Sequence, residues 1–112
     1  MSPTLLIIED EALLGQELQR HFRREGWETR HAANLEAARA ILWGHAFEPA
    51  VVLSDMNLPD GNALDLLDEA RRAALPGEWV FITGYGSVPD SVRAVKLGAL
   101  DFLEKPVDIG RL

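Results

Sequence analysis

The sequence predicts an α/β fold: a doubly wound, five-stranded parallel sheet with helices on both faces. Short apolar segments alternate along the chain with longer segments in which apolar residues recur at helical spacing. The short segments are too apolar to leave either face of a sheet in water, which is typical of parallel strands joined by helical crossovers. We expect the strands at residues 4–10, 27–33, 50–55, 78–83 and 100–105. A chain of 112 residues is expected to form a single domain, residues 1–112.

The first two helices have recognisable ends. One helix is expected over residues 11–25, followed by Gly26, a residue type that suits the position just after a helix. Its apolar stripe consists of Leu13, Leu14, Leu18 and Phe22. The next strand is more polar and is therefore expected near an edge of the sheet. Asn34 can cap a second helix that runs to about Trp43, because its side chain can accept a hydrogen bond from a first-turn N–H.

The third strand is the most apolar of the five and is expected near the centre of the sheet. Asn62 can cap a third helix, which ends before Pro76. A fourth helix is expected to begin near Pro89, since proline is well tolerated in the first turn. Its apolar face consists of Val88, Val92 and Val95.

The end of the chain differs from a complete fold of this class. Asp108 is expected to cap a fifth helix, but only residues 109–112 follow, so that helix is truncated. We therefore expect the chain to be an N-terminal fragment of a longer protein. Apolar surface is expected to lie bare around Leu97, Phe102 and Leu103, and bare apolar patches promote self-association.

Charge and composition narrow the possible partners. The formal net charge of −7 repels phosphate backbones, so direct nucleic-acid binding is not expected. The absence of cysteine excludes disulfides and thiolate metal sites. No apolar run is long enough for a membrane span, and the first residues lack the pattern of a signal peptide. A cytoplasmic location without membrane contact is expected.

Polar residues gather where the predicted strands end. In open parallel sheets, ligands bind outside the carboxyl ends of the strands, where the strand order reverses. The residues expected there are Glu9, Asp10 and Glu11 after the first strand, Asp55 after the third, Thr83 and Gly84 after the fourth, and Lys105 after the fifth. The second strand is followed only by Ala32, Ala33 and Asn34, and is expected to contribute nothing. Placing it at an edge gives the flavodoxin-like order 2-1-3-4-5, in which Asp10 and Asp55 face each other.

This set of residues favours phosphoryl chemistry. Carboxylates that crowd together repel one another unless a cation intervenes, and oxygen ligands completed by water suit Mg²⁺. The carboxylate of Asp55 can attack phosphorus to form an acyl phosphate. Mg²⁺ and Lys105 would offset the charge on the phosphoryl oxygens, and the hydroxyl of Thr83 can donate to one of them.

Four segments in order resemble the receiver domains of bacterial two-component response regulators: "LLIIEDE", "LSDMNLPDGNALDLL", "FITGYGS" and "KLGALDFLEKP". The stretch "TGYGSVPDSVRAVKLGALDFLEKPVD" is most similar to the NtrC-like branch, whose members drive an ATPase domain and a DNA-binding domain. The resemblance covers nearly the whole chain. It implies a phosphorylation-dependent signalling switch, and not an enzyme, that takes a phosphoryl group from a sensor histidine kinase. It also implies a C-terminal effector domain that regulates transcription.

The resemblance also implies roles for single residues. Asp55 would be the phosphoacceptor, Thr83 and Lys105 would sense the phosphoryl group, and Phe102 would turn inward on activation. The ligands of Mg²⁺ would be Glu9, Asp10, Asp55 and the backbone carbonyl of Asn57. The residues that tune the phosphoryl lifetime would be Asn57 and Tyr85. The acidic pair is Glu-Asp where many relatives have Asp-Asp, which leaves open whether Glu9 binds the metal directly or through water. A homodimer through the face of the fourth helix and fifth strand is expected.

Three other functions fit the sequence less well. A haloacid-dehalogenase-like phosphatase needs a second aspartate two residues after the nucleophile, where this chain has Asn57, and it needs a longer core. A flavodoxin-like FMN binder needs a phosphate loop rich in Ser, Thr and Gly after the first strand, where residues 9–11 are all acidic. A receiver used only as a scaffold would lack part of the chemical set, and here every member is present.

Overall fold

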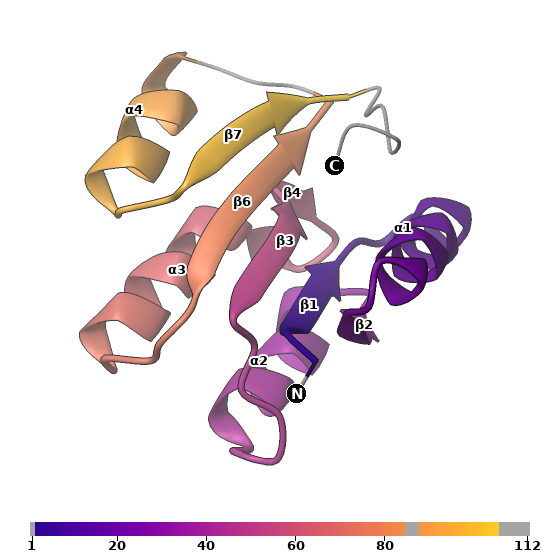
Figure 1. Cartoon of the computed structure of the whole chain (residues 1–112). Coiled ribbons are helices and arrows are strands. Elements are labelled where there is room, and N and C mark those ends of the chain that lie inside the picture. Colours follow the sequence, from indigo (N-terminus) through magenta and orange to yellow (C-terminus); the bar gives the residue numbers. More distant parts are fainter. Residues whose placement is uncertain (1, 85–87, 106–112) are drawn as a thin grey trace.

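The computed structural model describes residues 2–84 and 88–105, and it shows a five-stranded parallel sheet with helices on both faces (Figure 1). The strands of this sheet are β1 (Thr4–Ile8), β2 (Glu28–Ala32), β3 (Val51–Asp55), β6 (Glu78–Thr83) and β7 (Asp101–Glu104). The helices are α1 (Ala12–Arg24), α2 (Leu35–Trp43), α3 (Ala63–Arg72) and α4 (Val88–Lys96). The strand order β2-β1-β3-β6-β7 confirms the predicted order 2-1-3-4-5.

A small second sheet follows β3. Its strands, β4 (Asn57–Leu58) and β5 (Gly61–Asn62), pair antiparallel, with Asn57 opposite Asn62. These two strands were not predicted from the sequence, because strands of two residues are too short to show a period. The hairpin gives the segment between Asp55 and α3 a defined path.

The sheet separates two apolar cores (Figure 1). The core under α1 contains Leu5, Ile7, Leu18, Leu53 and Ile82. The larger core under α2, α3 and α4 includes Leu6, Ile8, Val52, Trp79 and Phe81. Successive side chains of β1 point to opposite faces and all are buried from Leu5 onward, as expected for a central parallel strand. Each such aliphatic burial contributes about 1.5–3 kcal/mol, so an acidic residue at Ile7 would break the fold.

The predicted helix caps are present. Oδ1 of Asn34 accepts a hydrogen bond from the N–H of Ala37 at 2.8 Å, and Oδ1 of Asn62 accepts one from the N–H of Leu64 at 2.8 Å. Gly26 follows α1 with φ of +95°, a left-handed conformation that glycine adopts without strain. These local signals set the helix ends correctly.

The predicted stripe of α1 packs against the smaller core at Leu14, Leu18 and Phe22, and the structure differs from expectation at Leu13 and on α4. Leu13 is 77% exposed on α1, because the stripe that packs on the sheet passes through Leu18, about 140° around the helix axis. On α4 the small Ala94 packs against the core, while Val92 and Val95 are exposed. The predicted valine face of α4 therefore points to solvent at those two positions.

The exposed apolar surface predicted near the end of the chain involves different residues from those expected. Leu97 and Phe102 are half-buried against the larger core, and Leu103 is half-buried against the smaller one. The exposed apolar side chains of this region are Val92, Val95 and Leu100. The predicted helix at Asp108 lies outside the described residues. Within the part of the chain that the structure describes, no helix combines the length and apolar character needed to cross a membrane.

Candidate functional site

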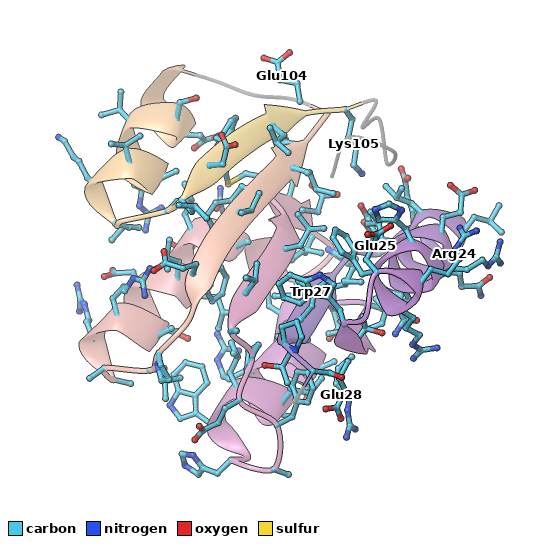
Figure 2. The ribbon with its side chains drawn as sticks, in the orientation of Figure 1. Arg24, Glu25, Trp27, Glu28, Glu104 and Lys105 are labelled. Carbon is cyan, nitrogen blue, oxygen red and sulfur yellow. The ribbon has the colours of Figure 1, made fainter. Side chains whose placement is uncertain are left out.

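The predicted polar residues converge at the carboxyl ends of β1, β3, β6 and β7. Parallel pairing brings these ends to the same edge: Ile8 lies opposite Ser54, Asp55 opposite Ile82, and Thr83 opposite Glu104. Figure 2 shows Lys105 pointing from the end of β7 back toward the neighbouring strands, while Glu104 points away from them. The edge carries an acidic cluster and a lysine.

The acidic cluster consists of Glu9, Asp10 and Asp55. Each can place one carboxylate oxygen within 4.8 Å of the others. Glu9 and Asp55 are buried, whereas Asp10 is exposed. A site with few carboxylate oxygens and one side open to water fits Mg²⁺, which retains several of its own waters.

The buried carboxylate of Glu9 lacks part of its hydrogen bonding. Its Oε2 accepts from the N–H of Glu11 at 3.1 Å. Its Oε1 has no aligned hydrogen-bond donor among the described residues, although Nζ of Lys105 lies 3.0 Å away as an ion pair. A buried oxygen in this state is a suitable ligand for a cation.

The pKa of Glu9 is raised to about 7, chiefly by burial and in smaller part by the nearby charge of Asp55. The N–H of Glu11 and the ammonium of Lys105 lower it in part. Near neutral pH this carboxyl therefore loses its proton at little cost. A divalent cation at the cluster would favour the ionised form.

Lys105 bridges the two buried carboxylates. Its Nζ lies 3.0 Å from Oδ2 of Asp55 and 3.0 Å from Oε1 of Glu9, and 3.8 Å from Oε2 of the exposed Glu11. Burial by itself would lower the pKa of Lys105, but its close contacts with the carboxylates of Glu9 and Asp55 outweigh this and raise it. The lysine is therefore held charged at the edge of the sheet where the sequence predicted a functional site.

The remaining predicted residues surround this centre. Thr83 is buried at the end of β6, and its carbonyl accepts from the N–H of Lys105 at 2.8 Å. The N–H of Asn57 donates to Oδ1 of Asp55 at 3.4 Å, and the Asn57 side chain is exposed. Phe102 is half-buried in β7. Tyr85, predicted to tune the phosphoryl lifetime, lies outside the described residues.

Two contacts at the site were missed from the sequence. The prediction that the second strand contributes nothing is wrong, because Nε2 of His31 in β2 lies 2.7 Å from the backbone oxygen of Glu9. Asp60, in the turn between β4 and β5, accepts from the N–H groups of Leu35 and Glu36 at 2.8 and 2.9 Å. These bonds join the loop after Asp55 to the start of α2, and chiefly the bond from Leu35 lowers the pKa of Asp60. An acid before glycine in a turn was the only signal for the second contact.

Comparison with known proteins identifies the family. Residues 5–112 match the model of the response regulator receiver domain. The chain belongs to this family. Its strand order and the cluster at the strand ends belong to the receiver domain fold, and receiver domains serve two-component signalling.

This receiver domain is similar in sequence and in structure to several response regulators. It is 40% identical over 107 residues to the response regulator PilR of Pseudomonas aeruginosa, covering 96% of this chain and 24% of PilR. It is similar in structure to the beryllofluoride-activated NtrC4 receiver dimer, with a TM-score of 0.85, 30% identity, and coverage of 96% and 88%. A Burkholderia pseudomallei response regulator, solved with a phosphorylated aspartic acid, a calcium ion and citrate, gives a TM-score of 0.83 at 28% identity, with coverage of 97% and 63%. The chain spans only about a quarter of PilR.

Proposed function

We propose that Asp55 is the phosphoacceptor of this receiver domain, and that phosphorylation shifts the domain to an active state. The observation that carries the proposal is the contact of Lys105 Nζ with Oδ2 of Asp55 at 3.0 Å, beside the acidic cluster. A carboxylate held against an ammonium and next to a cation site has the surroundings that an incoming phosphoryl group needs. The same aspartate ends the central strand of the sheet, where its backbone pairs with Ile82 of β6.

The chemistry is a substitution at phosphorus. An Asp55 carboxylate oxygen forms the new bond to phosphorus, and the bond from phosphorus to the donor nitrogen of a kinase phosphohistidine breaks, with the electron pair leaving on that nitrogen. When bound, Mg²⁺ would supply positive charge against the phosphoryl oxygens. Lys105 would neutralise a further oxygen, and the hydroxyl of Thr83, at the end of the strand paired with β3, would donate to another.

The metal ligands in this proposal are Glu9, Asp10, Asp55 and the backbone carbonyl of Asn57. Glu9 also forms an ion pair with Lys105. It would therefore balance the charge of that lysine both when it binds the ion directly and when it binds through water. Asn57 and Tyr85 would control the access of water to the acyl phosphate and thereby its lifetime. In this proposal the domain is a cytoplasmic signalling switch and not an enzyme.

The conformational change that follows phosphorylation would be transmitted through β6 and β7. Thr83 would move toward the phosphoryl group, and Phe102, on the neighbouring strand, would turn inward into the space released. The backbone bond from Lys105 to Thr83 supports this coupling, because it ties the end of β7 to the end of β6. A few kcal/mol of differential binding would suffice to reverse a modest two-state equilibrium.

The partners follow from the same proposal. A sensor histidine kinase would supply the phosphoryl group, and an effector domain outside this chain would regulate transcription. A homodimer through α4 and β7 is supported by the exposed apolar side chains of Val92, Val95 and Leu100. The NtrC4 receiver, a structural relative, forms a dimer in its beryllofluoride-activated state.

Mass measurement tests the phosphoacceptor. After incubation with acetyl phosphate and Mg²⁺, the intact chain should gain one phosphate, and Asp55→Asn should gain none. Asp68→Asn makes the same change of charge on the exposed face of α3, in an i,i+4 pair with Arg72, and should gain one phosphate. Phosphate on Asp55→Asn at the wild-type level would refute the assignment.

A further inference from the structure

The peptide that links the two metal-binding acids is held by β2. The N–H of Glu9 donates to the carbonyl of Ala32 at 3.0 Å, and the carbonyl of Glu9 lies 2.7 Å from Nε2 of His31. A carbonyl can only accept, so Nε2 of His31 carries the proton and donates. The peptide groups on both sides of the Glu9 Cα are thus fixed to the end of one strand.

Gly15 makes room for the His31 ring. A Cβ built at Gly15 would lie 2.5 Å from Cε1 and 2.6 Å from Nε2 of His31, closer than such atoms approach in proteins. Gly15 is buried in α1, where glycine is less favourable than alanine. The space it leaves allows the imidazole to lie between α1 and β2 with Nε2 on the Glu9 carbonyl. A methyl group at position 15 would therefore require the ring to shift away from its place on the Glu9 carbonyl.

The hydrogen bond from His31 holds the backbone directly before Asp10, the exposed member of the acidic cluster. The Glu9 carbonyl that accepts this hydrogen bond belongs to the peptide group that joins Glu9 to Asp10. Without a cation the three carboxylates repel one another, and an exposed loop residue is free to turn away. A fixed Glu9–Asp10 peptide keeps both acids directed toward Asp55.

We infer that His31 is a positioning residue for the divalent-cation site, acting through its hydrogen bond to the Glu9 carbonyl in the space left by Gly15. The inference rests on the proposed function, because it assumes that Glu9, Asp10 and Asp55 hold the cation. Hydrogen-bond partners outside the ligand set commonly contribute 10- to 100-fold to metal affinity. His31 would touch neither the cation nor the phosphoryl group, so its effect would be on the affinity for the cation.

Two substitutions separate the hydrogen bond from ring packing. His31→Phe keeps a ring without a donor, and should weaken Mg²⁺ binding, measured by calorimetric titration, by about 10-fold. His31→Gln keeps an N–H near the position of Nε2, and should restore most of the affinity. At saturating Mg²⁺ the phosphorylation rate of His31→Phe should return to near the wild-type rate, because only binding is impaired. Unchanged affinity in His31→Phe, or equal losses in both variants, would overturn the inference.

Gly15→Ala provides an independent test. In the wild-type background the added methyl group should displace the ring, weaken Mg²⁺ binding and lower the melting temperature. In a His31→Ala background the same substitution should raise the melting temperature, since alanine is the better helix former and no ring is displaced. A rise in both backgrounds with Mg²⁺ affinity unaffected would overturn the inference.

The wild-type titration separates this inference from the proposed function. If the wild-type chain binds no Mg²⁺ and gains no phosphate, the proposed function fails and the inference fails with it. If the wild-type chain binds Mg²⁺ and His31→Phe binds it equally well, only the role of His31 fails. Circular dichroism of each variant verifies that the fold is intact.

Discussion

Nζ of Lys105 lies 3.0 Å from Oδ2 of Asp55, although 50 positions separate the two residues in the chain. The same ammonium lies 3.0 Å from Oε1 of Glu9. Asp55 ends a central strand and Lys105 follows the edge strand β7, so the charge balance of the site depends on where that edge strand lies. The Thr83 carbonyl fixes this position through the backbone N–H of Lys105.

Lys105→Met should destabilise the protein by about 3 kcal/mol in Mg²⁺-free buffer at pH 8, because it leaves two buried carboxylates without their cation. Urea unfolding would measure the loss, and millimolar Mg²⁺ should recover part of it. Lys96→Met removes an exposed lysine from the last turn of α4 and serves as the matched control. Equal effects of the two substitutions would contradict a bridging role for Lys105.

Stability without metal should depend on pH through Glu9. Its pKa is raised from 4.5 to about 7 in the folded state. Below pH 4.5 the carboxyl is neutral in both states. Between pH 4.5 and about 7 the carboxyl ionises in the unfolded state but stays protonated in the folded state, so this contribution to stability falls progressively and is lost once pH has risen through the folded pKa. Glu9→Gln does not titrate, and its unfolding free energy relative to wild type should therefore rise from pH 5 to pH 8. The exposed substitution Glu36→Gln should show no such trend, and a flat difference for Glu9→Gln would disprove the assignment.

Mg²⁺ should stabilise the fold by mass action, because it binds the cluster of the native state only. At ten times the dissociation constant the gain is about 1.4 kcal/mol. Thermal melts with and without Mg²⁺ should differ for the wild-type chain, and the difference should shrink in Asp10→Ala. If millimolar Mg²⁺ leaves the melting temperature of the wild-type chain unchanged, the cluster is not a metal site of useful affinity.

The exposed face of α4 should mediate association of the activated domain. Val95 is 72% exposed there, so Val95→Glu should keep the fold and prevent a dimer that forms with Mg²⁺ and beryllofluoride. Sedimentation velocity would measure the two states at matched concentrations. Leu13→Glu makes a comparable change at a 77% exposed position on α1 and should leave the dimer intact. If both variants lose the dimer, or if neither does, the prediction that the interface lies on α4 is wrong.

Most of the architecture could be predicted from the sequence because its signals are local. The apolar runs of β1 and β3 indicated central strands, and Asn34 and Asn62 indicated helix starts, since a cap bonds to a backbone N–H only two or three residues away. The convergence of Asp55, Thr83 and Lys105 followed from a general rule, because the carboxyl ends of parallel strands meet at one edge. The sequence alone determined the fold class, the strand order and this edge.

The tertiary structure alone decided which distant groups touch. His31 reaches the Glu9 carbonyl across 22 positions with no signal in the chain. Asp60 reaches Leu35 across 25 positions, and an acid before glycine does not indicate which helix it contacts. On α4, Ala94 is buried while Val95 is exposed, which reverses what hydrophobicity predicts. The physical reason is that periodicity fixes a secondary structure, whereas the face a helix buries and the loop a side chain reaches depend on how the elements dock in space.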